Sequence, residues 1–252
     1  MEFEDKVVLV TGASRGIGRA VAKAFAEQGA RVGVHYNTNR ASAEQTRTAL
    51  PGGPHMTVQA DMSDPDAISR MVDEVIERMK KIDVLVNNAG IFEEHRLASV
   101  SYAEWRDHWK RTIDINLIGS AHTAYCVARH MMEQGGGKIV NVTSRGAFRG
   151  EPEAPAYGAS KAGQNALSQS LAKALAPHNI FVFAVAPGWV ATDMAEDSLA
   201  GPEGDAIRSQ SPLGRVAKPE EVAKAVLFLA SEDTDYMTGC ILDINGASYL
   251  RT

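Results

Sequence analysis

Tyr157 and Lys161 stand four residues apart near the start of a predicted helix. Side chains at this spacing lie on one helix face, so the lysine ammonium can lie beside the tyrosine phenol. Ser144 comes shortly after a predicted strand, and its hydroxyl can donate a hydrogen bond to a carbonyl oxygen. A tyrosine has a pKa of about 10, and a nearby ammonium favours the phenolate. We therefore expect these residues to exchange a proton with a substrate oxygen, with the pKa of Tyr157 lowered.

A glycine-rich turn follows the first predicted strand, from Thr11 to Gly18. Glycines let the backbone turn tightly and approach a pyrophosphate, and the N-terminus of the next helix offers free N–H groups. A position in the first strand–turn–helix unit is typical of a dinucleotide site. We predict cofactor contacts from Gly12, Ser14, Arg15, Gly16, Ile17 and Gly18.

The end of the second predicted strand indicates which dinucleotide is used. An acidic residue there would bond the ribose 2′-OH and repel a 2′-phosphate, but residues 32–40 hold no carboxylate. Arg15 and Arg40 are cations that can pair with a phosphate. Asn37 and Thr38 can donate hydrogen bonds to it. The sequence therefore favours NADP(H), with use of NAD(H) left open.

The same turn also fits a different chemistry, because Gly12-x-Ser14-x-Gly16 is the pattern around the nucleophile of serine hydrolases. A hydrolase of that kind needs an acid and then a histidine downstream, and no histidine follows His178. Gly18 has no role in such a nucleophile turn. A serine hydrolase therefore stays a remote alternative.

Apolar, β-branched runs alternate with amphipathic segments along the chain. We predict strands at residues 7–10, 31–36, 56–60, 83–87, 138–142, 180–186 and 240–244. We predict helices at residues 17–28, 41–50, 64–80, 102–133, 156–176 and 219–230. Such alternation gives a parallel sheet with helices on both faces, and ligands bind beyond the carboxyl ends of its strands. The expected fold class is α/β, with residues 1–252 as a single doubly wound Rossmann domain whose seven-stranded sheet is mainly parallel.

Composition excludes several other classes of protein. The chain has 252 residues, of which 44% are hydrophobic, and a formal net charge of -5. It contains no long run of lysine and arginine, so no nucleic-acid partner is expected. The longest apolar run, residues 180–186, is too short to cross a membrane. Cys126 and Cys240 are far apart, and the N-terminus lacks the apolar core of a secretory leader. We expect a cytoplasmic protein without disulfides or a metal site.

These motifs together resemble those of the short-chain dehydrogenase/reductase family, from the first strand nearly to the C-terminus. The turn from Thr11 to Gly18 resembles the coenzyme motif of that family, and Asn87-Asn88-Ala89-Gly90 resembles its motif at the fourth strand. Its catalytic tetrad is matched by Asn116, Ser144, Tyr157 and Lys161.

The resemblance implies an oxidoreductase that interconverts a ketone and a secondary alcohol. Tyr157 would be the general acid in reduction and the base in oxidation, and Lys161 would lower its pKa and bind the nicotinamide ribose. Ser144 would orient the carbonyl, and Asn116 would hold a water that links Lys161 to solvent. The further cofactor contacts that it implies are Asp61, Met62, Asn88, Ala89, Gly90, Pro187, Gly188, Val190 and Thr192.

Within the family the chain most resembles 3-oxoacyl-(acyl-carrier-protein) reductases, through residues 212–215, 219–222 and 238–239. Enzymes with other small-molecule carbonyl substrates share these features, so the substrate stays open. An acyl-carrier protein would need a basic patch, for which Arg129 and Lys173 are candidates. The loop of residues 145–153 is more charged than an acyl reductase leads us to expect.

Two further expectations concern the assembly and the movement of the chain. Residues 192–211 mix Met194, Leu199 and Ile207 with polar residues and glycines, so we expect a substrate lid that orders on binding. The resemblance also implies a homotetramer. The remaining alternative is a catalytically silent NADP(H)-binding regulator, and the intact tetrad argues against it.

Overall fold

The computed structural model describes residues 2–251, in which seven strands form one sheet in the order β3-β2-β1-β4-β5-β6-β7. Every neighbouring pair is parallel. The strands are β1 Val7–Val10, β2 Arg31–Tyr36, β3 Met56–Gln59, β4 Val84–Asn87, β5 Gly137–Val142, β6 Ile180–Pro187 and β7 Ile241–Ile244. The chain extends the sheet from β1 in one direction and then in the other. The expected doubly wound α/β fold with a seven-stranded sheet is confirmed.

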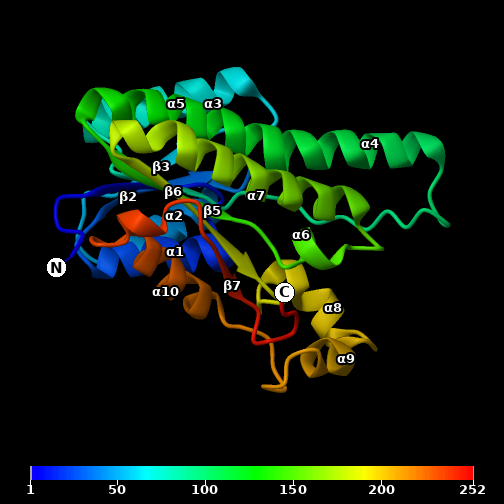
Figure 1. Cartoon of the computed structure of the whole chain (residues 1–252). Coiled ribbons are helices and arrows are strands. Elements are labelled where there is room, and N and C mark those ends of the chain that lie inside the picture. The colour runs from blue at the N-terminus through cyan, green and yellow to red at the C-terminus, as the bar shows by residue number, and fades with distance from the viewer. Residues whose placement is uncertain (1, 252) are drawn as a thin grey trace.

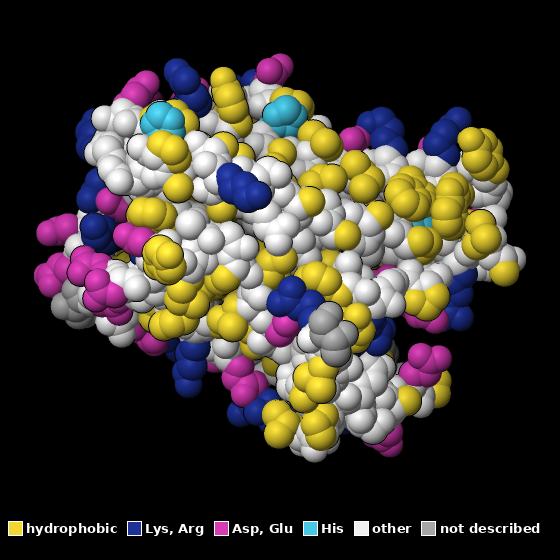
Figure 2. Space-filling model, viewed as in Figure 1, with side chains coloured by type: hydrophobic (Ala, Val, Ile, Leu, Met, Phe, Trp, Pro, Cys, Tyr) yellow, Lys and Arg dark blue, Asp and Glu magenta, His cyan; other side chains and the backbone are white. Residues whose placement is uncertain are grey.

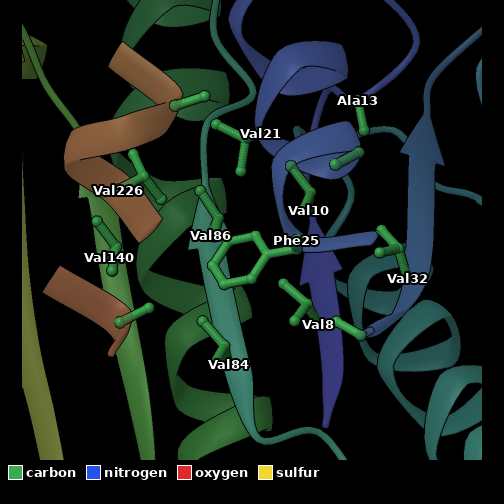
Figure 3. Packing of buried hydrophobic residues seen from close by; sticks show 14 of the residues in the cluster. Val8, Val10, Ala13, Val21, Phe25, Val32, Val84, Val86, Val140 and Val226 are labelled. Atoms are coloured by element: carbon green, nitrogen blue, oxygen red, sulfur yellow. The ribbon is translucent and has the colours of Figure 1, made fainter. Parts of the chain in front are cut away.

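Helices cover both faces of the sheet (Figure 1). One face carries α1 Gly16–Glu27, α2 Arg40–Ala49 and α10 Pro219–Ala230. The other carries α3 Pro65–Met79, α4 Tyr102–Ile113, α5 Gly119–Gln134 and α7 Pro155–Leu175. Each face has its own core, and β1 and β4 are buried along their whole length. Figure 3 shows Phe25 of α1 among the valines of β1 and β4. Continuous apolar strands are what two covered faces require.

The N-termini of the helices differ in their capping. At α3, the side chain of Asp64 caps the helix by accepting hydrogen bonds from the N–H groups of Asp66 and Ala67. At α4, Ser101 and Glu104 form a reciprocal capping box. At α1, by contrast, Arg15 makes no capping hydrogen bond with its side chain, and the first turn holds no acidic residue. The N–H groups at the start of α1 therefore remain available to a ligand.

The structure differs from the predicted elements in two ways. Residues 102–133 do not form one regular helix, because a π-helical turn, Asp114–Ile118, separates α4 from α5. Such single turns are frequent at functional sites. Three short helices were not predicted: α6 Gly146–Arg149, α8 Glu196–Ala200 and α9 Gly204–Ser209. Segments of four to six residues are too short to show a helical repeat. In the part of the chain that the structure describes, no helix is long and apolar enough to span a membrane.

Candidate active site

A cleft of about 620 Å³ lies at the carboxyl ends of the strands. Its walls come from the segments that follow β1, β2, β3, β4, β5 and β6. All of the predicted cofactor contacts line it except Gly18, and so do Ser144, Tyr157 and Lys161. A doubly wound sheet is expected to bind its ligand in this place.

The glycine turn between β1 and α1 has a backbone that requires glycine. Gly12 and Gly16 have φ angles of 64° and 53°. A Cβ atom on Gly12 would lie 3.0 Å from the Cα atom of Ala89, and one on Gly18 would clash with the carbonyl oxygen of Gly12. Gly18 therefore supports the turn from behind instead of lining the cleft. The tight turn and the uncapped α1 together fit a pyrophosphate, because its charge would satisfy the free N–H groups. Among residues 2–251, no histidine pairs with the hydroxyl of Ser14, which leaves the hydrolase alternative without a general base.

His35 of β2 anchors this turn, although the sequence did not mark it as a site residue. Its Nδ1 atom accepts a hydrogen bond of 2.9 Å from the N–H of Gly12, so its proton lies on Nε2, which donates to the carbonyl oxygen of Ala60 at 3.1 Å. Burial lowers the pKa of His35 to about 4. His35 is therefore neutral at physiological pH and ties the glycine turn to the end of β3.

The two asparagines after β4 have structural partners. Asn88 donates from Nδ2 to the carbonyl oxygens of Thr11 at 2.8 Å and Gly12 at 3.2 Å. Asn87 is buried and donates to Oδ1 of Asn141 at 3.0 Å and to the carbonyl of Ser120 at 3.2 Å. Asn88 thus lines the cleft and holds the turn in place, whereas Asn87 belongs to the buried frame.

The far end of the cleft holds the residues expected to select the cofactor. Asn37 and Thr38 are exposed there, and Arg40 is exposed but does not line the cleft. Arg15 does line it, and its guanidinium lies 3.9 Å from Asp193, with both side chains largely in solvent. Asp61 accepts bonds from the N–H and the hydroxyl of Ser63 through one oxygen, at 2.8 and 2.7 Å. Asp61 therefore shapes its own turn as well as lining the cleft.

The proton-transfer residues meet at the other end of the cleft. The phenol of Tyr157 and the hydroxyl of Ser144 share a hydrogen bond, and Ser144 also accepts one of 3.0 Å from the N–H of Gly146. The Nζ atom of Lys161 lies 5.8 Å from the centre of the Tyr157 ring. Phe92 packs edge-on against the same ring, with 5.1 Å between the centres. The i, i+4 pair on α7 therefore does lie beside Ser144.

In the chain alone, the pKa of Tyr157 is shifted upwards, whereas the sequence predicts a lowered pKa. Burial raises the pKa of Tyr157 to about 12, the bond with Ser144 opposes that rise, and the charge of Glu151 adds to it. Burial also lowers the pKa of Lys161 to about 7. The ammonium is thus only partly charged at neutral pH, and in the chain alone the desolvation of Tyr157 outweighs the effect of that charge. The chain by itself keeps Tyr157 protonated, as a proton donor requires.

Lys161 belongs to a buried hydrogen-bonded chain. Its Nζ atom donates to the carbonyl oxygen of Val142 and to Oε1 of Gln164, each at 2.9 Å. Gln164 donates from Nε2 to the hydroxyl of Ser120 at 2.7 Å, and that hydroxyl donates to the carbonyl of Asn116 at 2.8 Å. Gln164 and Ser120 are buried, and neither was predicted as a site residue. Their side chains link Lys161 to the backbone of the π-helical turn.

Asn116 itself does not line the cleft. Its side chain is fully buried, accepts a bond of 2.8 Å from the N–H of Ile91, and donates to Ile91 at 3.0 Å and to Ser160 at 3.1 Å. The amide therefore fixes the segment after β4 against α7. The water-holding role that the resemblance implies stays a prediction.

The segment after β6 closes the nicotinamide end. A Cβ atom on Gly188 would lie 3.1 Å from the Cα atom of Asn245, so the chain passes close to the C-terminal tail. Arg145, Glu151 and Trp189 also line this end, and none of them was predicted to do so. Met194 of the expected lid, residues 192–211, lines it as well. The candidates for a carrier-protein patch, Arg129 and Lys173, are exposed on α5 and α7 and do not line the cleft.

Comparisons with known proteins agree with this geometry. Residues 12–247 match the family described as "Enoyl-(Acyl carrier protein) reductase". A 3-oxoacyl-[acyl-carrier-protein] reductase FabG of Thermotoga maritima is 40% identical over 248 residues, covering 98% of each chain. An uncharacterized oxidoreductase of Methylorubrum extorquens is 36% identical, covering 97% of this chain and 98% of its own. A short chain dehydrogenase of Burkholderia cenocepacia, solved in complex with NADP, has a TM-score of 0.89 and 33% identity, covering 98% of this chain and 99% of its own.

Proposed function

This chain belongs to the short-chain dehydrogenase/reductase family, and we propose that it reduces a ketone to a secondary alcohol with Tyr157 as the proton donor. The observation that carries the proposal is the meeting of Ser144, Tyr157 and Lys161 at one end of a cleft whose other end borders an uncapped helix. When bound, NADPH supplies the hydride for the carbonyl carbon, and its oxidised ring supplies a positive charge.

The residues of the chain then have distinct tasks. Ser144 donates a hydrogen bond to the carbonyl oxygen and stabilises the charge that develops there. Tyr157 gives its phenolic proton to that oxygen, since burial keeps the phenol protonated at neutral pH. The ammonium of Lys161 donates to Val142 and Gln164, so one N–H group remains for the nicotinamide ribose, while its charge favours the developing phenolate.

NADP(H) is the proposed cofactor. Supporting observations are the absence of a carboxylate from residues 32–40, the position of Arg15 in the cleft wall, and NADP in the Burkholderia relative. A 2′-phosphate would compete with Asp193 for Arg15, and it would win because that ion pair is long and exposed. We expect kcat/KM to be at least about tenfold higher with NADPH than with NADH. Equal values would contradict the preference.

The decisive experiment follows the loss of NADPH absorbance with β-keto thioesters, diketones, sugars and keto-steroids. A 3-oxoacyl thioester belongs in the panel because curated relatives are named 3-oxoacyl-[acyl-carrier-protein] reductases. We expect turnover with at least one class and none in Tyr157→Phe. Cofactor binding without turnover on any ketone would instead support the silent regulator. Ester cleavage that is lost in Ser14→Ala would support the hydrolase.

We also propose that the chain works in the cytoplasm and that residues 192–211 form a lid over the substrate. A further proposal is that four chains assemble into a homotetramer. Tyr102 and Tyr125 on α4 and α5 are 81% and 67% exposed, and Phe228 and Tyr236 near the other edge are 51% and 104% exposed. Figure 2 shows hydrophobic side chains gathered over the end of α4 and the neighbouring loop. Two separate apolar surfaces suit two kinds of interface. Light scattering on the purified protein should give the mass of four chains, and a monomeric mass would contradict the proposal.

A further inference from the structure

Arg145 is a buried cation next to the catalytic serine. Only 3% of its surface is exposed, and its guanidinium donates to the hydroxyl of Ser248 and to Oε1 of Gln210. Both acceptors are neutral, and no carboxylate of residues 2–251 forms an ion pair with Arg145. Burial, together with the charge of Arg149, lowers the pKa of Arg145 to about 10, and the charge of Glu151 opposes this fall. The guanidinium is therefore still charged at neutral pH.

A buried charge without a direct ion pair is unusual, because desolvation is compensated by an ion pair and full hydrogen bonding. The charge of Glu151 acts on Arg145 only without direct contact. Lys138, which is 14% exposed at its side chain, pairs with Asp235 at 2.9 Å. In the described residues, Arg145 and Lys161 are the two lysines or arginines classed as buried, and neither pairs with a carboxylate. Lys161 serves the chemistry of the cleft. Like Lys161, Arg145 is therefore a buried cation without a carboxylate partner. The fold alone does not require such a cation.

The position of Arg145 connects it to the substrate end of the cleft. A second cavity of about 150 Å³ lies behind the cleft, and the two cavities share Arg145 and Trp189 in their walls. Ile207 and Leu213 give the second cavity an apolar side. A substrate whose carbonyl lies at Ser144 can therefore reach Arg145 with another group. Glu151 also lines the cleft, and its charge acts on both Tyr157 and Arg145.

We propose that the substrate carries a carboxylate that pairs with Arg145, which makes it a keto acid in reduction and a hydroxy acid in oxidation. This inference rests on the proposed function, because it names the substrate class of the same site. The planar guanidinium can make two parallel N–H···O bonds to a carboxylate. The carboxylate undergoes no change in the reaction: the carbonyl carbon accepts the hydride, and its oxygen accepts the proton of Tyr157.

The test compares keto acids with their primary amides, which differ in charge and little in shape. The panel uses linear acids with the ketone at successive positions, and it includes an N-acetylcysteamine 3-oxoacyl thioester as a neutral acyl substrate. We expect kcat/KM for the best keto acid to exceed that of its amide by at least about 30-fold. Arg145→Gln should remove most of this ratio and change the rate on the amide by less than about threefold. Arg149→Gln is the matched control, because it removes a charge from the same loop at an exposed residue that does not itself line the cleft, and it should keep the ratio.

Three outcomes would overturn the proposal. The first is equal rates on acid and amide in the unmodified protein. The second is an equal loss on both substrates in Arg145→Gln, as expected if Arg145 only ties Gln210 of the lid to Ser248 of the tail. The third is a thioester that is reduced faster than every keto acid.

A binding measurement separates this inference from the proposed function. Calorimetry on Tyr157→Phe loaded with NADPH gives the affinity for the keto acid without turnover. We expect Arg145→Gln in that background to weaken binding of the acid by at least about 30-fold and to leave binding of the amide unchanged. Reduction of neutral ketones without a preference for acids would refute the carboxylate site at Arg145 and would still agree with the proposed ketone reduction. Binding of acids through Arg145 without turnover of any ketone in the unmodified protein would refute the function and keep the anion site.

Discussion

Replacing Gln164 with leucine removes one of the two acceptors that hold the ammonium of Lys161. The other acceptor, the carbonyl oxygen of Val142, remains at 2.9 Å. Leucine nearly fills the same volume, so packing around the helix changes little. The charged form of Lys161 loses a hydrogen bond, whereas the neutral amine loses much less. The expected effect is a further fall in the pKa of Lys161, which burial already lowers to about 7.

The size of this fall follows from the lost bond. A buried hydrogen bond to a charged group is worth about 1.5–3 kcal/mol, and about 1.4 kcal/mol corresponds to one pKa unit. The pKa of Lys161 should therefore drop by about 1–2 units, to about 5–6. At pH 7 the charged fraction falls from about a half to between about a tenth and a hundredth. If reduction needs the ammonium, its rate at pH 7 should fall by about 5- to 50-fold.

The assay is the pH dependence of kcat for ketone reduction by NADPH. In the unmodified protein, the rate should fall as the pH rises through the pKa of Lys161, and in Gln164→Leu this fall should begin at lower pH. Gln164→Glu places a carboxylate beside the ammonium and should move the fall to higher pH. Asn165→Leu is the control: this neighbouring amide is also buried, but neither of its polar atoms has a hydrogen-bond partner in the described part of the chain. An unchanged pH profile in Gln164→Leu would refute the reasoning. So would a shift in the same direction in Gln164→Leu and Gln164→Glu.

Three other predictions concern the same cleft. Tyr157→Phe should abolish turnover and leave NADPH affinity within about twofold by fluorescence titration, since it removes only the phenolic hydroxyl. Lys161→Ala should lower both turnover and NADPH affinity. Full activity in either variant would contradict the assigned roles. Gly18→Ala should lower Tm and weaken NADPH binding, because its methyl group meets the carbonyl of Gly12 and lies 2.6 Å from Nδ2 of Asn88; normal binding would show that the turn can shift. The free energy of unfolding should fall as the pH drops from 6.5 to 4, by about 3 kcal/mol from His35 alone, because the unfolded chain binds a proton there that the folded chain excludes. Denaturant titrations should show that the free energy of unfolding depends less on pH in His35→Asn than in the unmodified protein. An equal pH dependence in the two proteins would show that His35 is not the cause.

The parts of the structure that the sequence predicts are those with a local pattern. Every strand was found because each is a short apolar run bounded by turns, and the i, i+4 spacing placed Tyr157 and Lys161 on one face of a helix. The glycine turn could be predicted because two of its positions, Gly12 and Gly16, have positive φ angles, which residues other than glycine rarely adopt. These features depend on neighbours along the chain, so spacing is enough to identify them.

The missed features depend on partners that are distant in sequence. His35 accepts a bond from a residue 23 positions away, and Gln164 reaches Ser120 across 44 positions. The raised pKa of Tyr157 in the chain alone could not be predicted, because the sequence shows the charge of Lys161, whereas desolvation is a property of the folded cleft. Arg145 was noted as part of a charged loop, but its burial comes from the lid and the tail, which no local pattern places over it.

The uncapped start of α1 ties the stability of this protein to its cofactor. Asp64 and Ser101 cap their own helices, and each such cap stabilises a domain by about 1 kcal/mol whether or not a ligand is present. At Arg15 the chain makes no such contribution, so the corresponding stabilisation depends on a phosphate in solution. At a cofactor concentration of one hundred times Kd, binding would raise the free energy of unfolding by about 2.7 kcal/mol. The resistance of the enzyme to unfolding, and with it its lifetime, would then follow the supply of the dinucleotide that it consumes.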